Sequence, residues 1–295
     1  INPVDVSAFR RPGAEIKEGL IPVNMFYLSQ NITENLSAEG FYQIGWDQTV
    51  VDNCGTFFSQ PDVIADGCNN NLAVLKTKNG LNSALPASLR SPVSNSLAAQ
   101  GVTFGNPDEG VIVRRGPDRD ARDSGQFGLA THYMFDPLDT EFGAYFMNYH
   151  SRNPIFSGQG APASAYSPAN LVGSLARNGV PLRTAAALAP TLLPLVVAGN
   201  SSYYVEYPED IRLYGLSFST TLPTGTAWSG EVSYRPNAPV QLNTTDILYS
   251  GLTPLNPNVS MLQGKPGTDQ SGYRRKEVTQ FQTRSEEHTS ELQSP

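Results

Sequence analysis

The sequence predicts an all-β fold, more specifically a fragment of an antiparallel transmembrane β-barrel with long extracellular loops and short periplasmic turns. Three observations predict it: apolar and polar side chains alternate with a period of two, hairpins with short turns recur, and long segments separate the hairpins. Transmembrane barrels combine strands of about ten residues with short turns at one end and long loops at the other. A β-sandwich also alternates, but loops this long are unusual inside a compact domain.

The alternation is clearest in residues 36–47, LSAEGFYQIGWD. A short turn joins them to residues 23–30, and the two strands are expected to form a hairpin. Their apolar face is expected to meet lipid and their polar face to meet water in the lumen. Phe41 is the bulky exception on the polar face. The residues expected to face lipid are Ala38, Tyr42, Ile44 and Trp46.

Two further hairpins follow the same rule. They are expected at residues 125–135 with 141–150 and at residues 210–221 with 228–235, and residues 276–283 start a seventh strand. Aromatic residues collect at both membrane interfaces of a barrel. One end would carry Trp46, Tyr149 and Tyr234 and the other Phe135, Phe142 and Trp228, and the residues expected to face the lumen are Glu39, Gln43, Gln126, His132 and Glu231.

Composition excludes several classes of protein. Of 295 residues only 16% are charged and the net charge is -7, so there is no basic patch of the kind that binds nucleic acid. The sequence has no uninterrupted run of about 18 apolar residues, so it predicts no transmembrane helix. The hydrolase, zinc-protease, phosphate-loop and dinucleotide motifs are missing, so we expect no enzymatic activity, no cofactor and no metal site.

The last twelve residues differ from the rest. RSEEHTSELQSP, residues 284–295, has no periodicity and resembles the translation of a common sequencing adapter. We therefore expect two parts: residues 1–283 as part of a barrel and residues 284–295 as a disordered, non-native tail.

Several runs of residues resemble one family. They include NPVDVSAFRRPGAEIKEGLIPVNMFY, DNCGTFFSQPDVIADGC, MNYHSR and VEYPEDIRLYGLSFSTTLPTGTAWSGEVSYRPNAPVQLNTTD. They are similar to the proteobacterial family called Domain of Unknown Function 1302, and the resemblance extends over nearly all of residues 1–283. It implies an outer-membrane barrel longer than this chain, so that the present sequence would be an interior fragment.

Two features of the first long segment bear on its environment. Cys54 and Cys68 are the only cysteines, and an oxidising compartment favours a disulfide between them. Zinc is the alternative, but it needs four ligands and no CxxC or nearby histidine pair supplies them. Further on, residues 114–123 mix arginine and aspartate, and these charges either pair with one another at the rim or fold inward as a constriction.

The second long segment contains an apolar stretch, residues 181–199, PLRTAAALAPTLLPLVVAG. Pro190 and Pro194 are expected to prevent a continuous helix. An apolar loop must cover something, so we expect a lid that offers a hydrophobic surface to a solute. Packing against neighbouring loops is the alternative. The lid residues would be Leu188, Leu192, Leu193 and Val196.

These features predict a porin-like protein of the bacterial outer membrane. The apolar stretch favours lipid-like or other hydrophobic compounds as the solute rather than ions. The expected partners are outer-membrane lipids, a hydrophobic small molecule, and a transport component in the periplasm or inner membrane. The alternative function is a surface-exposed structural or binding barrel whose lumen is plugged.

Overall fold

The computed structural model describes residues 2–59, 62–76, 81, 84–105 and 110–287. Its larger sheet has seven strands in the order β1-β2-β5-β6-β9-β10-β12, and every pairing within it is antiparallel. The predicted antiparallel strands and all three hairpins are confirmed. The strands are β1 (Met25–Asn31), β2 (Leu36–Gln43), β5 (Gln126–Phe135), β6 (Thr140–Tyr149), β9 (Ile211–Thr221), β10 (Thr226–Gln241) and β12 (Tyr273–Glu287).

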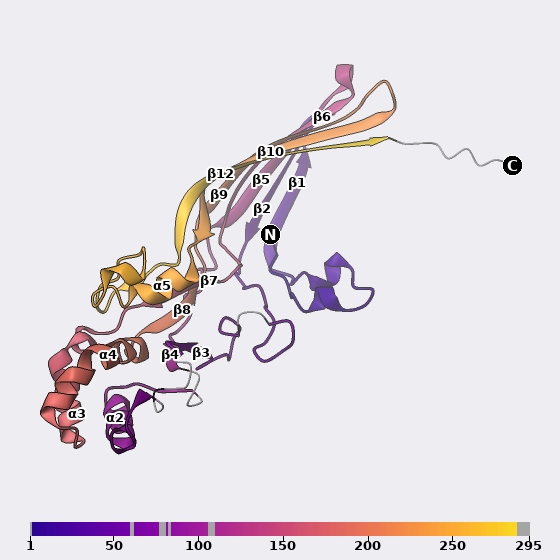
Figure 1. The fold of residues 1–295 in the computed structure, drawn as a ribbon. Helices are drawn as coiled ribbons and strands as arrows, with labels where there is room; N and C mark the ends of the chain where they lie inside the picture. Colours follow the sequence, from indigo (N-terminus) through magenta and orange to yellow (C-terminus); the bar gives the residue numbers. More distant parts are fainter. Residues whose placement is uncertain (1, 60–61, 77–80, 82–83, 106–109, 288–295) are drawn as a thin grey trace.

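The order of strands in this sheet follows the order of the chain. Short turns join β1 to β2, β5 to β6 and β9 to β10, and all three lie at the same end of the sheet (Figure 1). Two of these turns contain a residue with positive φ, Asp139 at 45° and Gly225 at 83°. Aspartate and glycine tolerate this left-handed conformation better than most residues, so the chain can reverse within a few residues.

The three long segments between the hairpins fold together at the opposite end of the sheet (Figure 1). We call residues 44–125, 150–210 and 242–272 the cap unit. Each segment contributes to one five-stranded sheet of order β11-β7-β8-β4-β3, in which β4 and β8 are parallel. The long segments are therefore not independent loops. The strands are β3 (Leu72–Val74), β4 (Val111–Arg115), β7 (Ile155–Gln159), β8 (Ser202–Glu206) and β11 (Asp269–Gln270).

Within the described residues, four helices pack beside this second sheet and enclose its main hydrophobic core. They are α2 (Ala87–Ala99), α3 (Pro168–Arg177), α4 (Leu182–Asn200) and α5 (Thr244–Ser250). α3 begins with an N-cap, since the Ser167 side chain accepts a hydrogen bond from the Asn170 amide, and Pro168 occupies the first turn. The core contains Val93 and Leu97 of α2, Leu171 and Leu175 of α3, and Leu192 and Val196 of α4, each at most 1% exposed.

The expectation that Pro190 and Pro194 break residues 181–199 is wrong. Both lie inside α4, which is continuous over 19 residues. A proline leaves the carbonyl four residues earlier without its hydrogen bond, but Ala186 and Pro190 are exposed, so water can satisfy these two carbonyls. Burial of the opposite side of the helix offsets the remaining cost, because tertiary packing supplies most helical stability.

The expected lid is corrected as well. Leu192, Leu193 and Val196 are 1%, 5% and 1% exposed in the core of the cap unit, and Leu188 packs against that core. By length and composition alone α4 could cross a membrane, but it packs as a core helix of the cap unit. These side chains therefore offer no surface to a solute, and the alternative of packing against neighbouring segments is what the structure shows.

The fold is mostly antiparallel β-sheet, as predicted, but two details differ from the expectation. The all-β expectation does not include helices α2 to α5. Within the described residues the seven-stranded sheet is also open, with β1 and β12 at its edges. Residues 284–287, expected to begin a disordered tail, continue β12 and pair with β10. Residues 288–295 of that tail lie outside the described residues.

The predicted disulfide is confirmed. Cys54 and Cys68 are bonded across a sequence separation of 14, with their Cα atoms 5.8 Å apart. Cys68 is 1% exposed, and its carbonyl accepts a hydrogen bond from the buried Tyr203 hydroxyl. The Tyr203 hydroxyl also donates to the Val63 carbonyl, so these hydrogen bonds hold the cross-linked part of the first long segment against β8.

Replacing Cys54 by serine is expected to lower the free energy of unfolding of the cap unit by about 3 kcal/mol, because a cross-link over a loop of this size restricts the unfolded chain. Denaturant titration of the wild type and C54S, each with and without reductant, measures it. Reductant should lower the free energy of unfolding of the wild type but not that of C54S. If the wild-type thiols alkylate fully without reduction, the bridge does not form in solution.

Candidate membrane interface

One face of the seven-stranded sheet is apolar and exposed. Paired residues of neighbouring strands point to the same side, so the register assigns each side chain to a face. We call this side the apolar face. Its exposed large side chains are Phe26, Leu28, Tyr42, Phe127, Leu129, Tyr133, Phe142, Tyr214, Leu216, Trp228, Val232, Tyr234 and Phe281.

Aromatic rings gather at both ends of the apolar face. Near the cap unit Phe146 contacts Phe127 and Tyr214, with ring centroids 5.9 and 5.1 Å apart. Near the turns Phe218 and Trp228 meet edge to face at 4.8 Å. Between these groups lies a row of mostly smaller or aliphatic side chains: Gln30, Ala38, Thr131, Ala144, Leu216, Val232 and Phe281.

The opposite side, which we call the polar face, carries all five residues expected to line the lumen. Register places Glu39, Gln43, Gln126, His132 and Glu231 on it, together with Glu141, Ser217 and Gln280. His132 Nδ1 lies 3.0 Å from a carboxylate oxygen of Glu141, and the Tyr145 hydroxyl lies 3.0 Å from Ser217 Oγ. That this face lines a lumen stays a prediction.

Phe41, the bulky exception on the polar face, packs across a glycine. A Cβ added to Gly128 on the neighbouring strand would lie 2.4 Å from the Phe41 ring. Phe218 covers Gly230 on the apolar face in the same way, also at 2.4 Å. An aromatic ring lying over a glycine restores side-chain packing where the strand has none. Phe41 therefore needs no plug to cover it.

The expected ends of the faces need correction at three positions. β2 ends at Gln43, so Ile44 lies beyond the strand. Trp46 turns into the cap unit, where its ring packs against Tyr207 at 4.8 Å and its Nε1 donates to the Ser151 carbonyl. Tyr149 shares a row with Ile211 on the polar face, so it is not part of the aromatic groups of the apolar face.

At the base of the polar face lies a buried polar cluster that sequence analysis missed. Arg152 is 5% exposed, and its guanidinium donates to the Gln43 side chain at 2.8 Å, to the Gln126 side chain at 3.4 Å and to the Asp47 carbonyl at 2.6 Å. Gln43 and Gln126 are fully buried. Gln43 therefore holds the cap unit to the sheet rather than facing open water.

His150 also connects the cap unit to the seven-stranded sheet by hydrogen bonds. Its Nε2 donates to the Ser124 carbonyl at 2.8 Å, and its Nδ1 accepts from the Asp210 amide at 3.0 Å, which places a ring proton on Nε2. The Asp210 carboxylate accepts from Arg122 and from Asn148. The Arg122 hydrogen bond is the main reason that the pKa of Asp210 lies below its usual value. His150 thus joins the segments that lead into β5 and β9.

Three arginines of residues 114–123 form ion pairs. Arg115 pairs with Asp118, Arg119 with Asp269, and Arg122 with Glu209 and Asp210. Only the first of these pairs lies within the run itself. The structure therefore supports pairing, mostly with distant segments, and not a ring of free charges.

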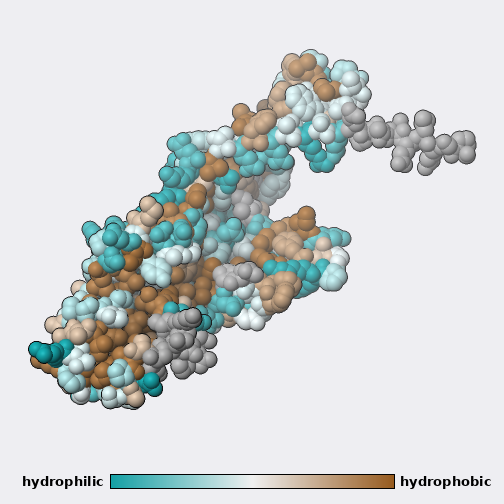
Figure 2. Space-filling view, viewed as in Figure 1, coloured by the Kyte–Doolittle hydropathy of each residue, from teal (hydrophilic) through white to brown (hydrophobic). Residues whose placement is uncertain are grey.

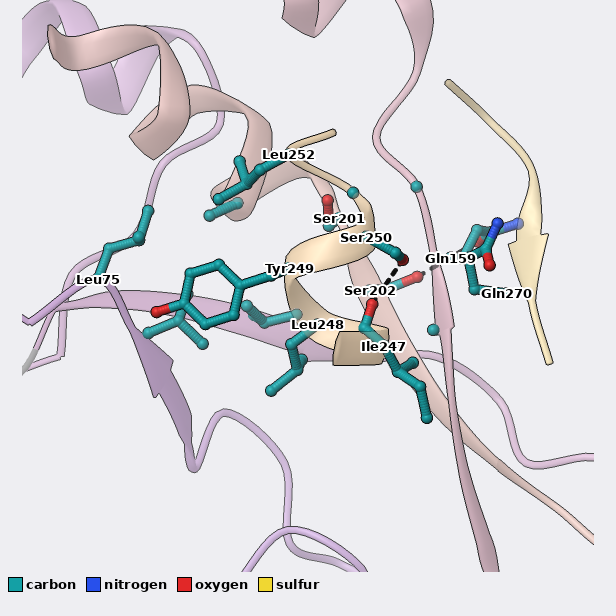
Figure 3. Close-up of a pocket in the computed structure, with 16 residues that line it drawn as sticks. Leu75, Gln159, Ser201, Ser202, Ile247, Leu248, Tyr249, Ser250, Leu252 and Gln270 are labelled. Atoms are coloured by element: carbon teal, nitrogen blue, oxygen red, sulfur yellow. Dashed lines mark hydrogen bonds between the residues drawn. The ribbon is translucent and has the colours of Figure 1, made fainter. Parts of the chain in front are cut away.

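The cap unit also contains an apolar pocket between α5, β7 and the ends of β3 and α4 (Figure 3). In Figure 2 apolar residues cover much of the helical end of the molecule in this view. The side chains of Ser202 and Gln159 lie on one side of the pocket and hydrogen-bond to each other at 3.2 Å. Its apolar lining is Val74, Leu75, Val113, Ala198, Ile247, Leu248 and Leu252.

Comparison with known proteins gives one result. A family model described as "Protein of unknown function (DUF1302)" matches residues 1–293. The chain belongs to this family. No curated protein and no solved structure matches it. The match covers both sheets of this DUF1302 chain, so the seven-stranded sheet and the cap unit lie within the extent of one family.

Part of the buried cluster has a signal in the sequence. The run MNYHSR, which carries part of the resemblance to DUF1302, contains both His150 and Arg152. The signal is a pair of titratable side chains directly after a predicted strand. An ordinary polar loop would explain such a pair equally well. The pairing of β6 with β5 and β9, and of β5 with β2, brings them to Gln43, Gln126 and Asp210.

Proposed function

We propose that the seven-stranded sheet of this protein is part of the wall of a β-barrel in the bacterial outer membrane, with its apolar face in lipid. The observation that carries the proposal is the separation of side chains between the two faces, with aromatic groups at both ends of the apolar one. A water-soluble sheet that exposed this many large apolar side chains on one face would associate through it.

The dimensions of the sheet support this location. β5 and β6 have 10 residues each and β9 has 11, and a tilted strand needs about 9–11 residues to cross a bilayer. The eight steps from Phe127 to Phe135 along β5 span roughly 27 Å, or about 20 Å along the membrane normal for a strand tilted by about 40°. The apolar band of such barrels is about 25 Å high. The disulfide fits an oxidising compartment.

Closure of this barrel requires strands beyond those described. Bacterial single-chain barrels have an even number of strands, from eight upward, and this sheet has seven with two open edges. In this arrangement β1 and β12 would each pair with a further strand, because an unpaired backbone edge is costly in lipid. The polar face would then surround an aqueous interior.

We further propose that this barrel passes lipid-like or other hydrophobic compounds. Two observations support this solute class: Phe41, Met147 and Leu213 share a row of the polar face, and the cap unit at its mouth contains the apolar pocket of Figure 3. A transport partner in the periplasm or inner membrane would supply or remove the solute.

A plugged barrel that acts as a surface structure or binding module is the second candidate. The observation that favours it is the cap unit, whose own core and second sheet are built from all three long segments. A folded unit of this kind at one end of the strands can block a lumen as well as select a solute.

Permeation distinguishes the two candidates. The protein purified from its own membrane is reconstituted into vesicles, and entry of a hydrophobic fluorescent tracer is compared with entry of a small sugar. A transporter of hydrophobic compounds should speed tracer entry relative to protein-free vesicles. Vesicles that take up neither compound faster would reject transport and leave the binding barrel, and protein that never enters the bilayer would reject both.

A further inference from the structure

A recess lies where the polar face of the sheet meets the cap unit, and its described lining has positive charge but no carboxylate. Arg152 and Arg235 both line it, and Tyr149, Thr49 and Asn153 add polar groups. We call it the arginine recess. Its apolar part consists of Ile155, Ile211 and Pro239.

Arg152 is an unusual residue to find at this position. It is 5% exposed, yet its guanidinium donates to neutral oxygens of Gln43, Gln126 and Asp47, and its Nε has no acceptor among the described residues. Burial lowers the pKa of Arg152, which shows the cost of desolvating the charge, and the carboxylate of Asp47 opposes this shift without forming an ion pair. A buried cation is normally paired with an anion.

Arg235 brings a second positive charge to the same recess. It lies on the polar face of β10 just before the register shift between Arg235 and Ala238, which turns the strand at the edge of the recess. Its side chain is half-buried and forms no ion pair within the described part of the chain. Two arginines beside one recess repel each other, and a bound anion would relieve this repulsion.

We infer that the arginine recess binds an organic carboxylate, with the carboxylate between Arg152 and Arg235 and the apolar part of the ligand against Ile155 and Ile211. Guanidinium groups suit this role because their planar arrangement of donors matches the two oxygens of a carboxylate. The apolar residues explain why an organic anion fits better than a small inorganic one. This inference concerns a site in the protein and does not depend on transport.

The test uses benzoate as the probe and benzamide, its uncharged counterpart of nearly equal shape, as the matched ligand. Binding of each to the full chain in detergent is titrated by calorimetry. We expect saturable binding of benzoate with an affinity at least about tenfold higher than that of benzamide. Equal affinities, or no saturable binding of benzoate, would overturn the inference.

Variants locate the site. Arg235→Gln removes the half-buried charge and should weaken benzoate binding at least about tenfold, whereas Arg212→Gln, an exposed arginine on the apolar face, should leave it unchanged. Arg152→Lys keeps a buried charge but loses the paired donors, so it should also weaken binding. Circular dichroism is used to check that each variant is folded. Equal affinities of R235Q and R212Q would place the binding elsewhere and contradict the proposed site.

Discussion

Replacing Leu216 by arginine is expected to lower the free energy of unfolding in a lipid bilayer by about 2–4 kcal/mol, the cost of a charge on the lipid side near the midplane of a barrel. Leu216 lies in the central row of the apolar face between Ala144 and Val232, and it is 60% exposed. In water, an exposed position of this kind would tolerate the change to within about 0.5 kcal/mol. The large effect is therefore expected only if the apolar face lies in a bilayer, as proposed.

The adjacent residue provides the matched control. Ser217 lies on the same strand but on the polar face, so Ser217→Arg should cost much less. Denaturant titration of both variants folded into phospholipid vesicles measures the difference. Equal stability of L216R and S217R would contradict the assignment of the faces and, with it, the proposed barrel wall.

Replacing Leu192 by alanine is expected to lower the free energy of unfolding of the cap unit by about 2–5 kcal/mol, because it removes a fully buried side chain and leaves a cavity. Leu192 is 1% exposed in the core that α4 forms with α2 and α3. Circular dichroism during thermal unfolding would detect the loss, since these helices belong to the cap unit.

Leu182 on the same helix is the control. It is 67% exposed, so Leu182→Ala should change the stability by less than about 0.5 kcal/mol. A lid that contacts a solute in place of a core would give the opposite pattern for Leu192, with stable protein and reduced binding. That result would restore the sequence-based interpretation of residues 181–199.

The sheet could be predicted from the sequence because its signal is local. A period of two with short turns predicts both the strands and the face of each side chain, so the sequence alone assigns Glu39, His132 and Glu231 to one face. The pattern becomes unreliable where the strand ends. Ile44 and Trp46 keep the same alternation beyond Gln43, but hydrogen bonding to Ser151 takes the Trp46 side chain into the cap unit.

The cap unit could not be predicted because its signal is not local. β4 and β8 pair across the intervening hairpin, and each of the three long segments contributes only short strands to the shared sheet. Within α4 the propensity of Pro190 and Pro194 opposes a helix, and only the packing of Leu192 and Val196 against other segments decides in its favour. Arg152 was missed for the same reason, since two of its three partners, Gln43 and Asp47, are more than 100 residues away along the chain.

The chain-ordered sheet has a consequence for the sequence of folding events. Each hairpin closes a short loop, which takes microseconds, whereas β2 can meet β5 only after the ends of an intervening segment of about eighty residues come together. We therefore expect the hairpins to form early and the cap unit to hold β2 beside β5 as it gains its core. In pulse-labelling hydrogen exchange, the β1–β2 amides should become protected before those between β2 and β5. Assembly of the seven-stranded sheet would then depend on the cap unit at its end.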